Sequence, residues 1–453
     1  MNKSRRIFII LIVSSCLVGL VLYVFFNTSI VSRPLLRYVL LKNFKDYQVQ
    51  SLTFHQQFIF PKTLVFRKME GVLVSKQFSR KLYLIRWDQA TVTRNSAKSF
   101  DIRVKDLGIR FEDLDLQGAA LEVQLALEQN RFRKLKGTFF ADRLKSPSYE
   151  FSNLWTSILA KPDGGLLKNI SIKGYQGEFK GEIAWQRESS ADSRLKLDFI
   201  GDHFVYKQNA KQYALDQPYL KVEVVLAKSK LKDLEGFLKI GQLVMSPVKI
   251  SHWVSNLKGG EGTIQLTDIN ADVYEGKLTG QISLEYQPPF PYSMAMNIHK
   301  VNFEALQEIN AAFFSQFEGH LDGQVLVAGE QNRVNTIQSD FSVPEGGKAR
   351  AALVAYLLQY GLPPGTQQRE LLDFLLSTDG KIPAEELSLS FQNVSSNKIS
   401  GIYKIHSKQL NVDLNNSFDF NLDSDLVSLG QTAEQIKVGL MALMDPAHLK
   451  EGL

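Results

Sequence analysis

The sequence is poor in the residues from which disulfide scaffolds, metal centres and common catalytic sites are built. Cys16 is the single cysteine among 453 residues, which excludes an intrachain disulfide framework and a multi-cysteine metal site. None of the seven histidines belongs to an HExxH motif, and neither GxSxG nor GxxxxGK[ST] occurs. We therefore expect no catalytic residues, no cofactor and no metal site, and hence a protein that is not an enzyme.

Grouped carboxylates are also scarce. Asp419, Asp423 and Asp425 could in principle bind a cation, but such a group more often marks the solvated face of an edge strand. Asp113 and Asp115 share one face of a predicted strand, where paired carboxylates could suggest glycoside hydrolysis. No second signal accompanies either group, so we interpret both as surface residues.

Positive charge is concentrated at the N-terminus. The formal net charge is +6, and Lys3, Arg5 and Arg6 supply three of these charges. The rest of the chain has no stripe of Lys and Arg interleaved with aromatic residues, so we expect no nucleic-acid partner.

An apolar run follows this basic tail. Residues 7–26 (Ile7–Phe26) contain no charge, and at about 1.5 Å per residue a helix of this length spans roughly 30 Å, the hydrocarbon thickness of a bilayer. The positive-inside rule then places the long remainder outside the cytosol. Val13–Cys16 resembles a bacterial lipobox, and a cleaved secretory signal is a further alternative. We favour an uncleaved anchor because Leu17–Phe26 stays apolar beyond the cleavage point.

Beyond the anchor, alternating apolar and polar residues predict antiparallel strand after strand. Hydrophobic content of 44% and charged content of 22% fit a folded chain, and the length favours two or more units. We predict a mainly β fold: an elongated, twisted antiparallel sheet or β-groove with a few short helices and one N-terminal transmembrane helix. Helices are predicted at Arg33–Phe44, Phe151–Lys161, Ser251–Lys258, Asn302–Phe314, Lys348–Tyr360, Thr366–Ser377 and Gln431–Met444.

These patterns divide the chain into six regions. They are a cytosolic basic tail (1–6), a transmembrane anchor (7–26), an N-terminal antiparallel β region (27–150), a first repeat-bearing β region (151–246), a region with the second and third repeats (247–345), and a C-terminal part with a helical insertion, closing strands and an amphipathic helix (346–453).

An internal repeat is the most informative motif. Its pattern is an aromatic residue, any residue, Gly, any, a large apolar residue, any, Gly. The three copies place their aromatic and glycine residues at Tyr175, Gly177 and Gly181; at Tyr274, Gly276 and Gly280; and at Phe317, Gly319 and Gly323. The large apolar residues and the glycines fall on the same set of alternate positions, which is the spacing expected of a strand with one buried face. The glycines should therefore leave gaps in the apolar face, at bends or close approaches of the backbone. Three copies indicate a repetitive β architecture.

These repeats carry a resemblance to a known family. The segment 251–329, with TDINADVYEGKLTGQISLEY, then MAMNIHKVNFEALQEI, then FEGHLDGQVLVAG, resembles the C-terminal region of AsmA-like proteins, and 152–185 is a weaker copy. The resemblance implies a β-groove protein of the bacterial envelope, single-pass in the inner membrane with most of the chain in the periplasm. It further implies a role in outer-membrane biogenesis or in lipid transport between envelope membranes, with membrane lipids and other envelope proteins as partners.

Coverage of the apolar face leads to the candidate site. Strands with one apolar face outnumber the helices able to cover them. Acyl chains could cover the apolar surface that the helices leave exposed. Lipid contact is expected on two neighbouring strands, at Leu278, Ile282, Leu284, Met294, Met296 and Ile298. The alternative is a sheet that covers its own apolar face and acts without transport, as an envelope scaffold or assembly factor working through protein–protein contacts.

Overall fold

The structure is a computed structural model that describes residues 47–421 apart from breaks in the chain. The breaks are 60–62, 76–81, 97, 112–113, 129–130, 147–148, 190–191, 209–210, 228–229, 246, 310, 332, 356–373, 376, 378–379, 396–397 and 409–411. The predicted anchor at 7–26 and the helices at 33–44 and 431–444 lie outside the described residues. Within the described ranges, no helix has the length and hydropathy to cross a bilayer.

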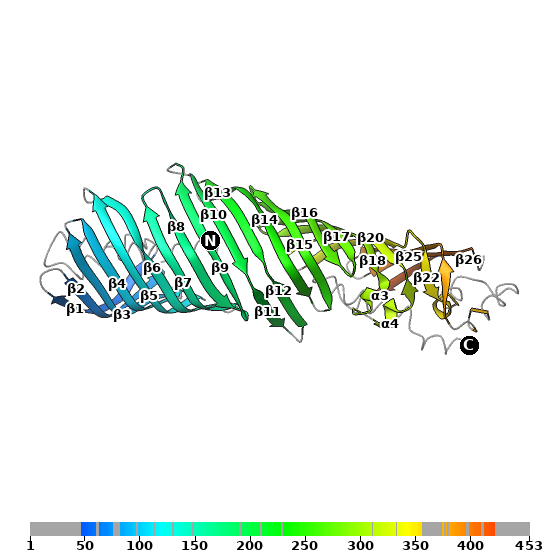
Figure 1. The fold of residues 1–453 in the computed structure, drawn as a ribbon, viewed down its shortest axis with the longest axis horizontal. Coiled ribbons are helices and arrows are strands. Elements are labelled where there is room, and N and C mark those ends of the chain that lie inside the picture. The colour runs from blue at the N-terminus through cyan, green and yellow to red at the C-terminus, as the bar shows by residue number, and fades with distance from the viewer. Residues whose placement is uncertain are drawn as a thin grey trace. The chain divides into compact units, whose positions relative to one another are not determined.

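The chain divides into two compact units, Met1–Val205 and Tyr206–Leu453. In unit 1, ten strands pair antiparallel in chain order, each with the next, as Figure 1 shows. They are β1 (Tyr47–Ile59), β2 (Thr63–Ser75), β3 (Leu82–Ser96), β4 (Ser99–Phe111), β5 (Leu114–Glu128), β6 (Arg131–Ser146), β7 (Tyr149–Lys161), β8 (Gly164–Gly174), β9 (Gly177–Arg187) and β10 (Asp192–Gly201). Strand β11 (His203–Gln208) spans the boundary between the units.

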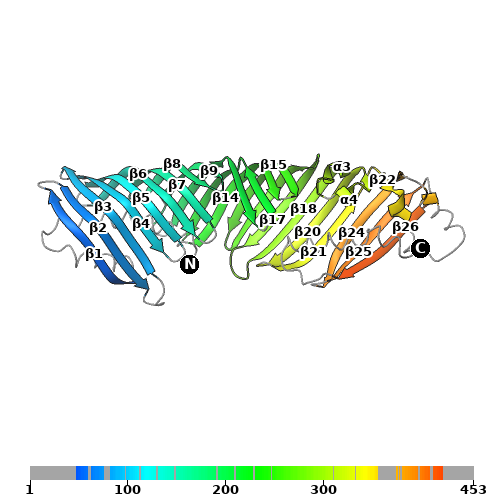
Figure 2. The ribbon, with the colours of Figure 1, turned by 90° about the horizontal axis from the view of Figure 1, so that it is seen from below.

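Unit 2 contains a second antiparallel series (Figure 2). Its strands are β12 (Lys211–Asp216), β13 (Tyr219–Ala227), β14 (Lys230–Met245), β15 (Val248–Gly260), β16 (Thr263–Val273), β17 (Gly276–Glu285), β18 (Pro291–Asn302), β20 (His320–Glu330), β21 (Arg333–Ser342), β24 (Glu386–Ser395), β25 (Lys398–Ser407) and β26 (Val412–Asn421). Each strand pairs with the next, except that the 16-residue β14 pairs with β12 along one half and with β13 along the other. The predicted mainly β, antiparallel fold with few short helices is confirmed.

A small helical and sheet assembly interrupts this series. It comprises α3 (Phe303–Leu306), α4 (Ala311–Phe314), a three-stranded sheet of β19 (Phe317–Glu318), β22 (Gly347–Arg350) and β23 (Lys381–Ala384), and helical residues 351–355. We call this assembly the cap. The helix predicted over Asn302–Phe314 is thus two single turns, with Asn302 as the N-cap of α3. The helix predicted from Lys348 begins only at residue 351, because 348–350 belong to β22.

Two predicted helices are strands, and β-bulges explain the error. Phe151–Lys161 lies in β7, and Ser251–Lys258 lies in β15. Asn153 and His252 have positive φ where the register with the next strand shifts, so each is the extra residue of a bulge. A bulge moves the following apolar residues by one position. The apolar spacing then becomes i, i+3, i+4, i+7, which is the pattern of a helix.

The repeat predicted from sequence is a repeat of three whole strands. Strands β7, β8 and β9 begin 99 residues before β15, β16 and β17, at 149 and 248, 164 and 263, and 177 and 276. The bulges obey the same spacing, with Asn153 matching His252 and Asn169 matching Asp268. The copies therefore share their local backbone irregularities as well as their motif.

The core of unit 1 lies on one face of β2–β7. Phe100 and Ile102 are 1% exposed and Ala119 is 0% exposed, and they belong to one continuous cluster of buried hydrophobic residues. Apolar residues of β8–β10 such as Phe179, Leu197 and Phe199 are only half-buried. Burial of the apolar face in unit 1 thus decreases toward its last strands.

Candidate functional site

One continuous uncharged surface crosses five strands of unit 2. Strand register places its members in rows: Ala271 opposite Leu278 and then Ile298, and Ile269 opposite Gly280 and then Met296. We call this surface the apolar face. Its members are Ile264, Leu266, Ile269, Ala271, Leu278, Gly280, Ile282, Leu284, Tyr292, Met294, Met296, Ile298, Gly323, Val325, Val327, Gly329, Val334, Ile337, Ser339 and Phe341. Its side-chain polar atoms are the hydroxyls of Tyr292 and Ser339.

All six residues predicted to contact lipid lie on this face. In register, Leu278 is opposite Ile298, Ile282 is opposite Met294, and Leu284 is opposite Tyr292. Leu278 and Met296 are 8% exposed, whereas Leu284 is 42% exposed. Ile282, Met294 and Ile298 are half-buried and pack against the buried members. The structure therefore brings the six side chains together; their contact with lipid stays a prediction.

The opposite face of the same strands is polar and exposed. Lys277 and Asp272 form an ion pair across β16 and β17, and the His252 Nδ1 lies 2.8 Å from Asp272 Oδ2. The hydrogen bonds from Lys277 and then from His252 hold the pKa of the Asp272 carboxyl below its usual value, because both favour the charged form. A similar pair joins His299 Nδ1 to Asp322 Oδ2 at 2.8 Å. Charge is thus confined to the face that meets water.

The predicted close approach to the backbone of the repeat glycines is confirmed, but the side chains that approach fill the gaps predicted in the apolar face. Gly181, Gly280 and Gly323 each lie beneath a large side chain of the strand opposite, whereas a Cβ added to Gly319 would lie nearest the Gly346 carbonyl oxygen and Cγ1 of Val343, both at 3.2 Å. A Cβ added to Gly280 would lie 2.7 Å from the Sδ of Met296, and one added to Gly323 would lie 2.3 Å from Cδ1 of Phe341. Gly181 in unit 1 has the same relation to Phe199, at 2.6 Å. Glycine is required at these three positions because a Cβ would overlap a side chain and a carbonyl oxygen of the partner strand.

The aromatic residue of the repeat is a turn residue, which sequence periodicity did not reveal. Tyr274 and Glu275 both have positive φ, 45° and 65°, in a two-residue loop between β16 and β17. This is the type I′ geometry that suits a hairpin. The Tyr274 hydroxyl donates to the Pro247 carbonyl (3.1 Å) and accepts from the Lys249 amide (3.2 Å). The tyrosine therefore ties its own hairpin to the neighbouring β14–β15 turn.

The other copies use the aromatic residue in related ways. Tyr175 and Gln176 form the same kind of turn, with φ of 52° and 68°, and the Tyr175 ring packs edge-on against Phe151 with centroids 5.8 Å apart. The third copy differs, because Phe317 begins β19 of the cap and stacks on Phe303 at 5.4 Å. Gly319, with φ of +123°, then turns the chain from β19 into β20.

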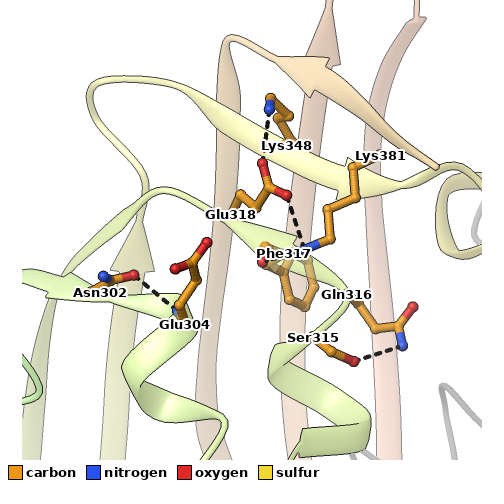
Figure 3. A network of polar contacts seen from close by, with 8 residues as sticks. All are labelled: Asn302, Glu304, Ser315, Gln316, Phe317, Glu318, Lys348 and Lys381. Carbon is orange, nitrogen blue, oxygen red and sulfur yellow. Dashed lines mark hydrogen bonds and ion pairs between the residues drawn. The ribbon is translucent and has the colours of Figure 1, made fainter.

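A polar network holds the three strands of the cap sheet together (Figure 3). Glu318 on β19 lies 2.8 Å from the Nζ of Lys348 on β22 and 3.3 Å from the Nζ of Lys381 on β23. Lys381 also donates to the Phe317 carbonyl at 3.1 Å. The hydrogen bond from Lys348 is the main reason that the pKa of Glu318 lies below its usual value. One carboxylate thus links strands that are distant in sequence.

The carboxylates considered as possible sites have structural partners. Asp115 accepts hydrogen bonds from Arg110 (3.0 Å) and from Gln117 (2.7 Å), and Asp419 forms an ion pair with Lys398 at 2.9 Å. Asp113, Asp423 and Asp425 lie outside the described residues. The described part of the chain contains no group of three His, Cys, Asp or Glu residues that could hold a metal ion.

The geometry defines a class of protein: antiparallel sheets in which one face is uncharged and apolar and the other carries the charge. Residues 205–341 match the family model described as the AsmA family, and the chain is AsmA-like over this region. This match contains the resemblance predicted over 251–329, which is confirmed, whereas the weaker copy at 152–185 lies outside it. No curated protein and no solved structure matches the chain.

Proposed function

We propose that this protein holds lipid acyl chains on the apolar face of unit 2, as part of lipid transport or outer-membrane biogenesis in a bacterial envelope. The single observation that carries this proposal is an uncharged surface, fully buried in some places and half-exposed in others, inside the AsmA-like region. The residues at 7–26 would anchor the chain in the inner membrane with its bulk in the periplasm. No chemical step is involved, and the ligand is recognised by its hydrocarbon.

The energetics of this binding are those of apolar burial. Each buried methylene contributes about 0.8 kcal/mol, so about ten methylenes in contact with the face give roughly 8 kcal/mol. Loss of translational and conformational freedom offsets several kcal/mol of this gain. The net affinity is then moderate, which allows a lipid to be released as well as bound.

Photo-crosslinking in cells tests the proposal. A crosslinking amino acid at Ile282 or Met296 should form lipid adducts, which mass spectrometry of the purified protein identifies. The matched controls are Lys277 and Asn297, which lie on the same two strands and point to the exposed face. Equal labelling of both pairs, or adducts with protein alone, would contradict lipid binding on this face.

A second function is favoured by the burial in unit 1. The cluster that contains Phe100, Ile102 and Ala119 is buried by the protein's own residues, so this part of the sheet needs no lipid to cover it. A scaffold or assembly factor that acts through protein contacts needs only such covered sheets. Protein adducts without lipid in the crosslinking experiment would support this alternative.

A further inference from the structure

The two ends of the apolar face differ in how well they are covered, and the cap covers one of them. Ala349, Ala351, Val354 and Leu375 are 0% exposed and belong to a buried cluster that also contains Phe303 and its neighbours. The cap is therefore a packed piece of structure, tied internally by Glu318 and its two lysines (Figure 3).

The cap packs directly on one end of the apolar face. Ile298 of that face packs against the cap cluster, as do Val273 and Leu321 from the adjoining strand ends. Leu387 on β24 and Ile405 on β25 are buried in the same cluster. In Figure 2, α3, α4 and β22 accordingly gather at one end of these strands. The apolar face therefore ends against the cap, at the row that contains Leu278 and Ile298.

Among the residues that the structure describes, the other end of the face is less well covered beside β17. Leu284, in the last row of the face, and Phe290, in the loop that joins β17 to β18, are each 42% exposed. This loop is held in place by hydrogen bonds from the Phe290 amide to the Gln287 carbonyl (2.7 Å) and from the Gln331 amide to the Phe290 carbonyl (3.3 Å). Two large, partly exposed apolar side chains therefore lie where the face ends beside β17.

On β20 and β21 the residues toward this end are buried in a second cluster, with Val327 3%, Val334 2% and Ile337 6% exposed, so the rise in exposure is confined to the strands beside Leu284. On β17 exposure increases from 8% at Leu278 to 42% at Leu284, with Ile282 half-buried between them. Six residues of strand correspond to about 20 Å. One acyl chain occupies about 15 Å of a bilayer, half of the roughly 30 Å hydrocarbon core. The stretch from Leu278 to Leu284 is therefore long enough for a single acyl chain laid along the strand.

We propose that the apolar face is open at one end only, on the side of β17, so that an acyl chain enters tail first past Leu284 and Phe290 and stops at the cap. This inference rests on the proposed function and adds to it the direction of entry. The polar headgroup stays at the open end, because the face provides no charged group along its length. Because the cap blocks the face beyond Ile298, the surface binds the apolar tail of an amphiphile and does not let the acyl chain pass further.

Position-resolved crosslinking of the full-length protein in cells tests this direction. A crosslinker is placed in turn at Phe290 at the open end, at Met294 in the middle and at Leu321 beside the cap. We expect lipid adducts at Phe290 and Met294, and at least about tenfold fewer at Leu321. Labelling of Leu321 equal to that of Phe290, or labelling of Met294 without Phe290, would overturn the one-ended arrangement while leaving lipid binding intact. Absence of lipid at all three positions would instead refute the proposed function.

A charge placed at the open end gives an independent test. Leu284→Glu should reduce lipid labelling at Met294 at least about fivefold, because the tail would have to pass a carboxylate. The control is Gln281→Glu, on the exposed face of the same strand, which should leave labelling unchanged. If the two variants label Met294 equally, lipid does not enter past Leu284.

Discussion

The repeat glycines give the sharpest prediction about stability. In Gly280→Val the first added carbon would lie 2.2 Å from the Ala295 carbonyl oxygen and 2.7 Å from the Met296 Sδ. The methionine can move, but the carbonyl belongs to the paired strand β18, so β17 and β18 must separate locally. Overpacking of this kind costs about 1–3 kcal/mol, and the involvement of backbone points to the upper part of that range.

Hydrogen exchange measures this cost where it arises. A loss of about 2 kcal/mol in local stability should speed amide exchange in β17 and β18 about 30-fold, since 1.4 kcal/mol corresponds to a factor of ten. The matched control is Thr279→Val, which changes the neighbouring side chain on the exposed face and should alter exchange little. Equal exchange in the two variants would show that close packing over Gly280 has no energetic role.

Three other predictions follow from the described contacts and from the sequence. Tyr274→Phe removes two hydrogen bonds to the neighbouring hairpin, which should cost about 1–2 kcal/mol and lower the melting temperature by several degrees in a thermal scan. The depressed pKa of Asp272 means that its ion pair with Lys277 stabilises the protein above the unfolded-state pKa of about 3.9 and is lost as the pH falls through the lower folded-state value. Asp272→Asn should therefore weaken denaturant resistance at pH 7 and match the parent protein in strong acid; a constant difference at all pH values would contradict this. Intact-mass analysis should find residues 7–26 retained, whereas an acylated N-terminal Cys16 would show that the anchor is cleaved.

Alternation alone predicted much of the sheet and the candidate site. The period-2 pattern of β17 and β18 correctly grouped Leu278, Ile282, Met294 and Met296 on one face, because in-register pairing keeps side chains of one parity together. The same reasoning failed where a bulge changes parity inside a strand. His252 shifts the apolar residues of β15 so that they imitate a helix, and no rule of local propensity marks that position in the sequence.

The remaining errors concern cross-strand contacts. That Met296 lies over Gly280, and that Tyr274 reaches the β14–β15 turn, depends on which residues become neighbours in space. Sequence showed that these positions are special, but only register shows what fills them. The helix predicted from Lys348 included residues 348–350 because β22, at four residues, is too short to show alternation.

The matched bulges of the two three-strand copies bear on how such a chain can change its length. Each copy carries its parity shifts within itself, at Asn153 and Asn169 in one and at His252 and Asp268 in the other. Gene duplication of a whole copy therefore adds strands without inverting the faces of those that follow. Deletion of one bulge residue would instead turn the apolar side chains beyond it toward water. Lengthening by a whole copy thus keeps the apolar side chains on one face, whereas a single-residue insertion or deletion at a bulge exposes those that follow it in the strand.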